Sequence, residues 1–271
     1  MKTRTLTALV LAPTAIALIL FVPTALFAAV TGAVFLYAIW EWTRLLGLRA
    51  QAARGAVVVL HALALIALWF VRGSLAWWGV ILAGVAWWSV APLWLRHFSF
   101  GVAPTRENTA LKLVIGFLIV VPAWCALLQV HAAAERGPWW ALFGLMLVWV
   151  ADSGAYLAGS RWGRSKLAPR ISPGKTWAGV YGALAASALV GIAGSALLGI
   201  SGAAMVGIFV LAMLTVLASI VGDLFESLIK RHANLKDSGD LFPGHGGMFD
   251  RLDSVFAALP VWAAGLALLR L

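Results

Sequence analysis

Residues 203–225 read AAMVGIFVLAMLTVLASIVGDLF, an apolar run whose one charged residue, Asp223, comes near its end. A helix needs about 20 apolar residues to cross the hydrocarbon core of a bilayer. The run therefore predicts a membrane-spanning helix that leads into a polar segment. Eight more runs of this kind lie at roughly 6–22, 24–43, 55–71, 75–95, 110–130, 139–159, 177–198 and 254–271.

The composition of the chain agrees with this interpretation. Of its 271 residues, 63% are hydrophobic and only 11% are charged, whereas ordinary soluble domains carry about a quarter charged residues. We therefore expect an all-α polytopic membrane protein with about nine transmembrane helices in one membrane domain, residues 1–271. The basic residues are scattered between apolar runs, which argues against a nucleic-acid partner. The single cysteine, Cys125, lies inside an apolar run and predicts a buried thiol.

The distribution of Lys and Arg predicts the orientation. With the N terminus in the cytoplasm, 17 of the 20 basic residues fall in inside segments, and Arg72, Arg136 and Arg270 fall outside. This is the bias that the positive-inside rule describes, and it accounts for much of the net charge of +10. We expect the first run to be retained rather than cleaved, because a second apolar run follows at once.

Small residues and tryptophans predict how the helices pack. Residues 178–199 are rich in Gly, Ala and Ser, which lets neighbouring helices approach closely. Six tryptophans sit towards the ends of runs, where indole rings commonly anchor at the headgroup level: Trp77, Trp78, Trp87, Trp88, Trp139 and Trp140.

The acidic residues are concentrated in the second half of the chain. Up to about residue 150 there are only Glu41, Glu107 and Glu135, all near predicted span ends or in loops. The other seven lie in or beside two inside loops, at roughly 160–176 and 226–253: Asp152, Asp223, Glu226, Asp237, Asp240, Asp250 and Asp253. Ionisable groups at membrane depth are costly and usually functional. We therefore expect the active site on the cytoplasmic side of the C-terminal half.

The first of these polar segments begins at Asp152, within an otherwise apolar run. Helical spacing puts Tyr156 and Gly159 on the same face. Two environments are open for Asp152: a metal-binding or polar cavity, or neutralisation by an Arg or Lys of a neighbouring helix.

The motif Ser172-Pro-Gly-Lys-Thr176 follows in the next loop. It is not a nucleotide P-loop, because that motif needs a Gly where this chain has Pro169. Pro173 is suited to begin a helix, whose free N–H groups would face an anion together with Lys175 and Thr176. An ordinary capping turn is the alternative.

The second polar segment follows directly from the apolar run at residues 203–225. If residues 222–231 are helical, Asp223, Glu226, Ser227 and Lys230 fall within an arc of about 100° and form one polar stripe. A stripe that grows out of an apolar span must face a cavity or the interface.

A glycine-rich turn then leads to a second acidic helix end. Asp250 and Asp253 are spaced i, i+3 and share a face, and carboxylates of this kind suit Mg2+ together with phosphate oxygens. His245 lacks a second His or Cys at metal-ligand spacing, so zinc is disfavoured. Its neighbours Gly246 and Gly247 would let the backbone approach a phosphate closely.

These segments together resemble the phosphatidate cytidylyltransferase, or CDP-diacylglycerol synthase, family of bacterial type. The resemblance rests on six blocks between about residues 150 and 255, in the family's order: Asp152-Ser-Gly-Ala-Tyr156, Ser172-Pro-Gly-Lys-Thr176, Ser227-Leu-Ile-Lys-Arg231, Lys236-Asp237, Pro243-Gly-His-Gly-Gly247 and Asp250-Arg-Leu-Asp253. It implies that residues 1–140 are variable transmembrane helices and that 141–271 carry the catalytic helices and cytoplasmic loops.

The resemblance also implies an activity. CTP and phosphatidic acid would give CDP-diacylglycerol and pyrophosphate in a bacterial inner membrane, with Mg2+ as cofactor; a homodimer is compatible with the pattern. The metal ligands would match Asp223 and Asp250. Phosphate neutralisation would fall to Lys175, Lys230, Arg231, Lys236 and Arg251, and hydrogen bonds to Ser172, Thr176, Gly246 and Gly247. Asp152 would bind substrate. Ligands or basic side chains would be oriented by Glu226, Asp237 and Asp253. The expected site is completed by Ser227 and His245.

Two other functions are consistent with parts of the sequence. The acceptor could be another lipid phosphate, because headgroup chemistry does not distinguish such lipids. A secondary transporter could use Asp152 and Asp223 in a proton or cation path. Transporters usually show paired inverted repeats, whereas the polar residues here fall in one half only.

Overall fold

The computed structural model describes residues 2–242 and 246–271, with side chains described from residue 12 onward. Nine helices and one short hairpin follow one another in this part of the chain: α1 (Lys2–Phe21), α2 (Thr24–Leu45), α3 (Gln51–Phe70), α4 (Leu75–Arg96), α5 (Arg106–His131), α6 (Gly137–Trp162), β1 (Lys166–Ala168), β2 (Ser172–Thr176), α7 (Trp177–Leu197), α8 (Gly202–His232) and α9 (Phe249–Leu269).

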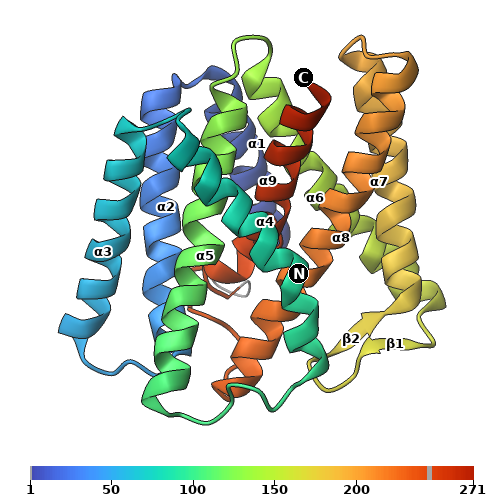
Figure 1. The fold of residues 1–271 in the computed structure, drawn as a ribbon. Coiled ribbons are helices and arrows are strands. Elements are labelled where there is room, and N and C mark those ends of the chain that lie inside the picture. Colours follow the sequence, from blue (N-terminus) through green and yellow to red (C-terminus); the bar gives the residue numbers. More distant parts are fainter. Residues whose placement is uncertain (1, 243–245) are drawn as a thin grey trace.

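Each predicted run corresponds to one helix, and the expected membrane fold is confirmed. Eight of these helices, α2 to α9, are long and apolar enough to cross a bilayer, and the described part of α1 adds the apolar turns of Ala12–Phe21. The helices form a bundle in which α5 and α9 are the most buried, while α3 lies at the edge (Figure 1).

The connections between the helices fall at two opposite ends of the bundle. The hairpin, the end of α8 and the α2–α3 and α4–α5 connections lie at one end (Figure 1). The α5–α6 and α7–α8 connections and the C terminus lie at the other. The first group contains the loops expected to be inside, so the arrangement is consistent with the predicted orientation; which end faces the cytoplasm stays a prediction.

Several tryptophans pack between helices instead of anchoring at the membrane surface. Trp77, Trp88 and Trp140 are buried, so anchoring at the headgroup level is wrong for these three, whereas Trp139 is exposed. The indole N–H of Trp88 donates to the Phe256 carbonyl at 3.1 Å. A buried indole N–H usually finds such a partner, although that of Trp77 has none among the described residues.

Helices α6 and α7 pack through small residues, as predicted. A Cβ on Gly182 would clash with Ala158 and would lie 2.5 Å from the Gly154 carbonyl oxygen. Because the two backbones approach this closely, the side chains at the hairpin end of both helices are held in a fixed relation.

The hairpin is a feature that the sequence reading missed. Ser172–Thr176 is a strand paired antiparallel with Lys166–Ala168, and α7 begins only at Trp177. The expectation that Pro173 begins a helix is therefore wrong. A proline is tolerated at the edge of a two-stranded hairpin because its missing N–H is not needed there. Thr176 is the helix N-cap, and its Oγ1 accepts a hydrogen bond from Gly179 N at 3.2 Å.

Candidate active site

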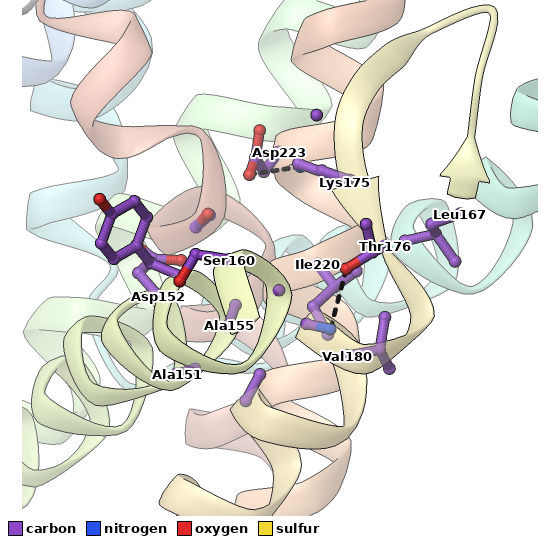
Figure 2. A pocket seen from close by; sticks show the side chains of 16 residues that line it. Ala151, Asp152, Ala155, Ser160, Leu167, Lys175, Thr176, Val180, Ile220 and Asp223 are labelled. Carbon is purple, nitrogen blue, oxygen red and sulfur yellow. Dashed lines mark hydrogen bonds and ion pairs between the residues drawn. The ribbon is translucent and has the colours of Figure 1, made fainter. Parts of the chain in front are cut away.

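A cavity of about 320 Å³ lies between α6, α7, α8 and the hairpin (Figure 2). Four residues predicted for the site line it: Asp152 from α6, Lys175 and Thr176 from β2, and Asp223 from α8. Lys175 Nζ forms an ion pair with Asp223, drawn as a dashed line in Figure 2. Most of the remaining lining is small or apolar, with Gly, Ala, Val, Leu and Ile side chains. A few convergent polar groups in an apolar cavity are typical of a ligand site.

Asp152 lies in a cavity with polar groups, and Lys175 and Arg251 are near enough to interact with its charge. It lines the cavity together with Tyr156, one turn further along the same face of α6. Among the described residues, no Lys or Arg forms an ion pair with Asp152. Ser160 and Ser254, which the sequence analysis did not select, also line the cavity.

An acidic cluster lies where α8 and α9 meet. Asp223, Glu226 and Asp253 each place a carboxylate oxygen so that all three lie within 4.8 Å of one another. Glu226 and Asp253 are buried, and Glu226 Oε1 has no hydrogen-bond partner among the described residues. Buried carboxylates normally have a cation or several donors beside them. A set of converging oxygens with one unsatisfied acceptor is therefore suited to a hard divalent cation.

Lys230 joins this cluster to the loop that precedes α9. Its Nζ lies 2.6 Å from Glu226 Oε2 and 2.6 Å from Asp250 Oδ1. The other oxygen of Asp250, Oδ2, accepts hydrogen bonds from Ser238 N at 2.8 Å and Gly247 N at 2.7 Å. The Ser238 hydroxyl, which has a single proton, lies 2.8 Å from Asp250 Oδ2 and 3.0 Å from Glu41 Oε2 and can donate to either. These contacts hold α8, α9 and the loop to one another.

The two carboxylates predicted as metal ligands have different surroundings. Asp223 belongs to the acidic cluster, together with Glu226 and Asp253. Asp250 lies beside Glu226, and Lys230 bridges the two carboxyl groups. Both oxygens of Asp250 already accept hydrogen bonds from the protein. Direct metal binding by Asp250 stays a prediction. The two carboxylates that cluster with Asp223 come from Glu226 and Asp253, which were expected to orient ligands or basic side chains.

The remaining predicted residues surround these two groups. Arg231 Nε donates to the Ile171 carbonyl at 3.2 Å and so ties α8 to the hairpin. Ser172 and Ser227 are half-buried, and Lys236, Asp237 and Arg251 are exposed around the end of α8 and the start of α9. Gly246 has a φ of +79° beside Asp250, and Gly247 is buried there. His245 lies outside the described residues.

One polar residue of the first half reaches the site from a distance. Glu41, in the last turn of α2, is buried, and its Oε2 accepts hydrogen bonds from Phe249 N and Ser238 Oγ. The sequence reading noted Glu41 only as an acid near a span end. One feature of the sequence could have identified it: Glu41 is the one acidic residue in the apolar helix α2. Ionisable residues within such helices are usually functional.

Fold and site together define a class: a multi-pass helical membrane protein with an acidic cluster and two lysines at one end of the bundle. The model of the cytidylyltransferase family matches residues 2–269. The chain is 41% identical over 270 residues to the phosphatidate cytidylyltransferase of Pseudomonas aeruginosa, covering 97% of this chain and 96% of that protein. It is 34% identical over 281 residues to the enzyme of that name from Haemophilus influenzae, covering 97% of each. The chain belongs to the cytidylyltransferase family, and the resemblance seen in the sequence is confirmed.

Proposed function

We propose that this protein transfers the cytidylyl group of CTP to phosphatidic acid and releases pyrophosphate, forming CDP-diacylglycerol. The observation that carries this proposal is the cluster of Asp223, Glu226 and Asp253 with Lys175 and Lys230 on either side of it. Full-length relatives named phosphatidate cytidylyltransferase support the same activity. The polar groups lie in one region, beside a cavity, and no observation favours the transporter alternative.

The reaction requires two polyanions to be brought together. An oxygen of the lipid phosphate forms a bond to the α-phosphorus of CTP, and the bond from that phosphorus to the bridging oxygen of pyrophosphate breaks. The attacking oxygen is already anionic near neutral pH, so a general base is not required. Positioning and charge neutralisation therefore contribute most of the rate enhancement.

A divalent cation fits the acidic cluster. Asp223, Glu226 and Asp253 supply oxygen ligands, and the unsatisfied Oε1 of Glu226 marks a position where a positive charge would be stabilised. We propose Mg2+, which prefers a few carboxylates and phosphate oxygens, with Asp250 as the further predicted ligand. When bound, such an ion neutralises charge that develops on the attacking and leaving oxygens.

The two lysines differ in what they can do. Among the described residues, Lys175 forms an ion pair only with Asp223, and it sits near the end of a hairpin strand. It can therefore turn to a substrate phosphate when Asp223 finds another partner. Lys230 is held between two carboxylates and provides a fixed positive charge. The Thr176 hydroxyl, at the start of α7, is placed to donate a hydrogen bond into the cavity.

The location of the cavity suits a lipid substrate. Its lining combines Lys175 and Thr176 with small apolar side chains of α6 and α7, so a headgroup can bind while its acyl chains stay in the bilayer. CTP would enter from the aqueous side at the hairpin end. We propose a bacterial inner membrane, with the cytoplasm at that end, and a catalytic half formed by residues 141–271. A homodimer stays a prediction.

The test is a direct assay of the purified protein in detergent micelles with CTP labelled in the cytidine, phosphatidate and Mg2+. We expect label to enter the organic phase as CDP-diacylglycerol. Asp223→Asn should lower turnover by about 100-fold or more, because a ligand of the cation is weakened. Glu135→Gln, which changes an exposed acid at the other end of the bundle, should leave turnover unchanged.

Other outcomes would change the assignment. A lipid-soluble product formed only from a different lipid phosphate would identify another acceptor. Ion flux in proteoliposomes without CTP, combined with no product, would revive a transporter. Normal turnover of a folded Asp223→Asn variant would show that the acidic cluster does not hold the cation.

A further inference from the structure

Glu41 makes contacts that the proposed reaction does not yet use. It lies on α2, a helix of the N-terminal half, and only 3% of its surface is exposed. Its Oε2 accepts a hydrogen bond from Phe249 N at 2.8 Å and one from Ser238 Oγ at 3.0 Å. These partners are the first residue of α9 and a residue of the loop between α8 and α9, so one carboxyl group of α2 binds the loop at two places.

Ser238 connects Glu41 to Asp250. The Ser238 hydroxyl lies 3.0 Å from Glu41 Oε2 and 2.8 Å from Asp250 Oδ2. A hydroxyl group carries one proton and two lone pairs, so a change at either carboxyl group alters what the hydroxyl offers to the other. Because Asp250 also holds Lys230, the chain of contacts runs from α2 to the centre of the site.

Two glycines show that the loop is fitted around this carboxyl group. A Cβ on Gly239 would clash with Glu41 Oε1, and a Cβ on Gly247 would clash with Glu41 Oε2 and with Ser238 Oγ. Neither glycine has a positive φ, so close approach rather than backbone conformation requires them. The loop backbone therefore lies directly against Glu41 on both sides.

We infer that Glu41 is a positioning residue, which holds the loop so that Asp250 faces Lys230 in the orientation that the site requires. The effect on kcat rests on the proposed function. The contacts of Glu41 with the loop do not depend on that function. A carboxyl group that fixes a neighbour of a charged site residue commonly changes activity or metal affinity by about 10- to 100-fold when it is removed. The N-terminal half thereby contributes to the site and is more than a membrane scaffold.

The experiment compares three substitutions of Glu41 in the full chain. Glu41→Ala removes both acceptors, and we expect kcat to fall by about 10- to 100-fold with the KM for phosphatidate little changed. Glu41→Gln keeps an oxygen that can accept from Phe249 N and Ser238 Oγ, so it should restore most of kcat. Glu41→Asp keeps the charge but withdraws the oxygens by about one bond length, and it should give an intermediate value. Glu107→Ala, an exposed acid of the same half, is the control.

A double-mutant cycle separates positioning from general stability. If Glu41 acts through Ser238, adding Glu41→Ala to Ser238→Ala should lower kcat by much less than Glu41→Ala does alone. If both effects on kcat are additive, or if folded Glu41→Ala keeps wild-type kcat, the inference is wrong. Should Glu41→Ala fail to fold, the Gln and Asp variants decide the matter in the same way.

Hydrogen–deuterium exchange gives a readout that needs no activity. The amides of Ser238, Gly247 and Phe249 should exchange faster in Glu41→Ala than in wild type, and at the wild-type rate in Glu107→Ala. Unchanged exchange at these amides would overturn the positioning role. If wild type forms no CDP-diacylglycerol but the exchange result holds, the proposed function fails and the positioning of the loop by Glu41 is retained.

Discussion

Lys230 provides the most direct test of how the charges in the site depend on one another. It is the one ammonium group, among the residues that the structure describes, that pairs with two carboxylates. Lys230→Met keeps an unbranched chain but removes the charge. Glu226, whose side chain is 2% exposed, would then lie beside Asp223 and Asp253 without an ion-pair partner of its own, because Lys175 pairs with Asp223.

The expected loss of stability follows from this burial. Removing one partner of a buried ion pair commonly destabilises a protein by about 3–5 kcal/mol. The Lys230 side chain is 14% exposed and its partners are 2% and 5% exposed, so solvent screens the pair little. For a chain of this size, 1 kcal/mol corresponds to roughly 2–4 °C in the midpoint of thermal unfolding. We therefore expect the midpoint of Lys230→Met to fall by roughly 6–20 °C.

The assay is thermal unfolding in detergent micelles, followed by circular dichroism, with turnover measured in parallel. Lys166→Met, which changes an exposed lysine of β1, should shift the midpoint by less than about 2 °C. Adding Glu226→Gln to Lys230→Met should recover part of the midpoint, because the unpaired carboxylate is then gone. Turnover should stay low in the double variant, because the fixed positive charge for the phosphates is still missing.

Two results would refute this reasoning. The first is a midpoint of Lys230→Met within about 2 °C of wild type, which would mean that the ion pairs contribute little. The second is that Glu226→Gln lowers the midpoint of Lys230→Met by the same amount as it lowers the midpoint of wild type. Additivity of that kind would show that the two side chains do not interact.

Three further predictions concern packing, the cation and the orientation. Gly182→Leu should separate α6 from α7, lower the free energy of unfolding by about 1–3 kcal/mol and reduce turnover. Gly79→Leu, at a helical glycine with open space around it, should change neither stability nor turnover. The midpoint of thermal unfolding and the rate of product formation are measured for both variants. Removing divalent cations with a chelator should abolish product formation, and titrated Mg2+ should restore it. In a Cys125→Ala background, which is free of cysteine, Arg164→Cys should react with a membrane-impermeant maleimide from the cytoplasmic side and Arg136→Cys from the opposite side; the reverse pattern would invert the predicted orientation.

Local patterns were sufficient to predict the helices. Each apolar run is long enough to span the membrane, and in a bilayer the backbone must then satisfy its own hydrogen bonds as a helix. The polar stripe of Asp223, Glu226 and Lys230 was predictable for the same reason, because helical spacing continues to His232 in α8.

The hairpin and the partners within the site could not be predicted in this way. Strands of three and five residues are too short for an alternating pattern to be distinguished from a turn. Glu41 and Ser238 are 197 residues apart, and only the packing of α2 against α9 brings them together. The way in which α8 and α9 cross likewise decides the partners of the acidic residues. It brings Glu226 and Asp253 to Asp223, and it pairs Asp250 with Lys230.

The N-cap at Thr176 has a consequence for selectivity. Its oxygen already accepts a hydrogen bond from Gly179 N, so the hydroxyl keeps one proton and one lone pair for a ligand in the cavity. A phosphate oxygen can take that proton, and a ligand N–H can donate to the remaining lone pair. The turn that starts α7 therefore offers the cavity a neutral hydrogen-bonding group that does not select the charge of a ligand, and any preference for an anion has to come from Lys175, which lines the same cavity.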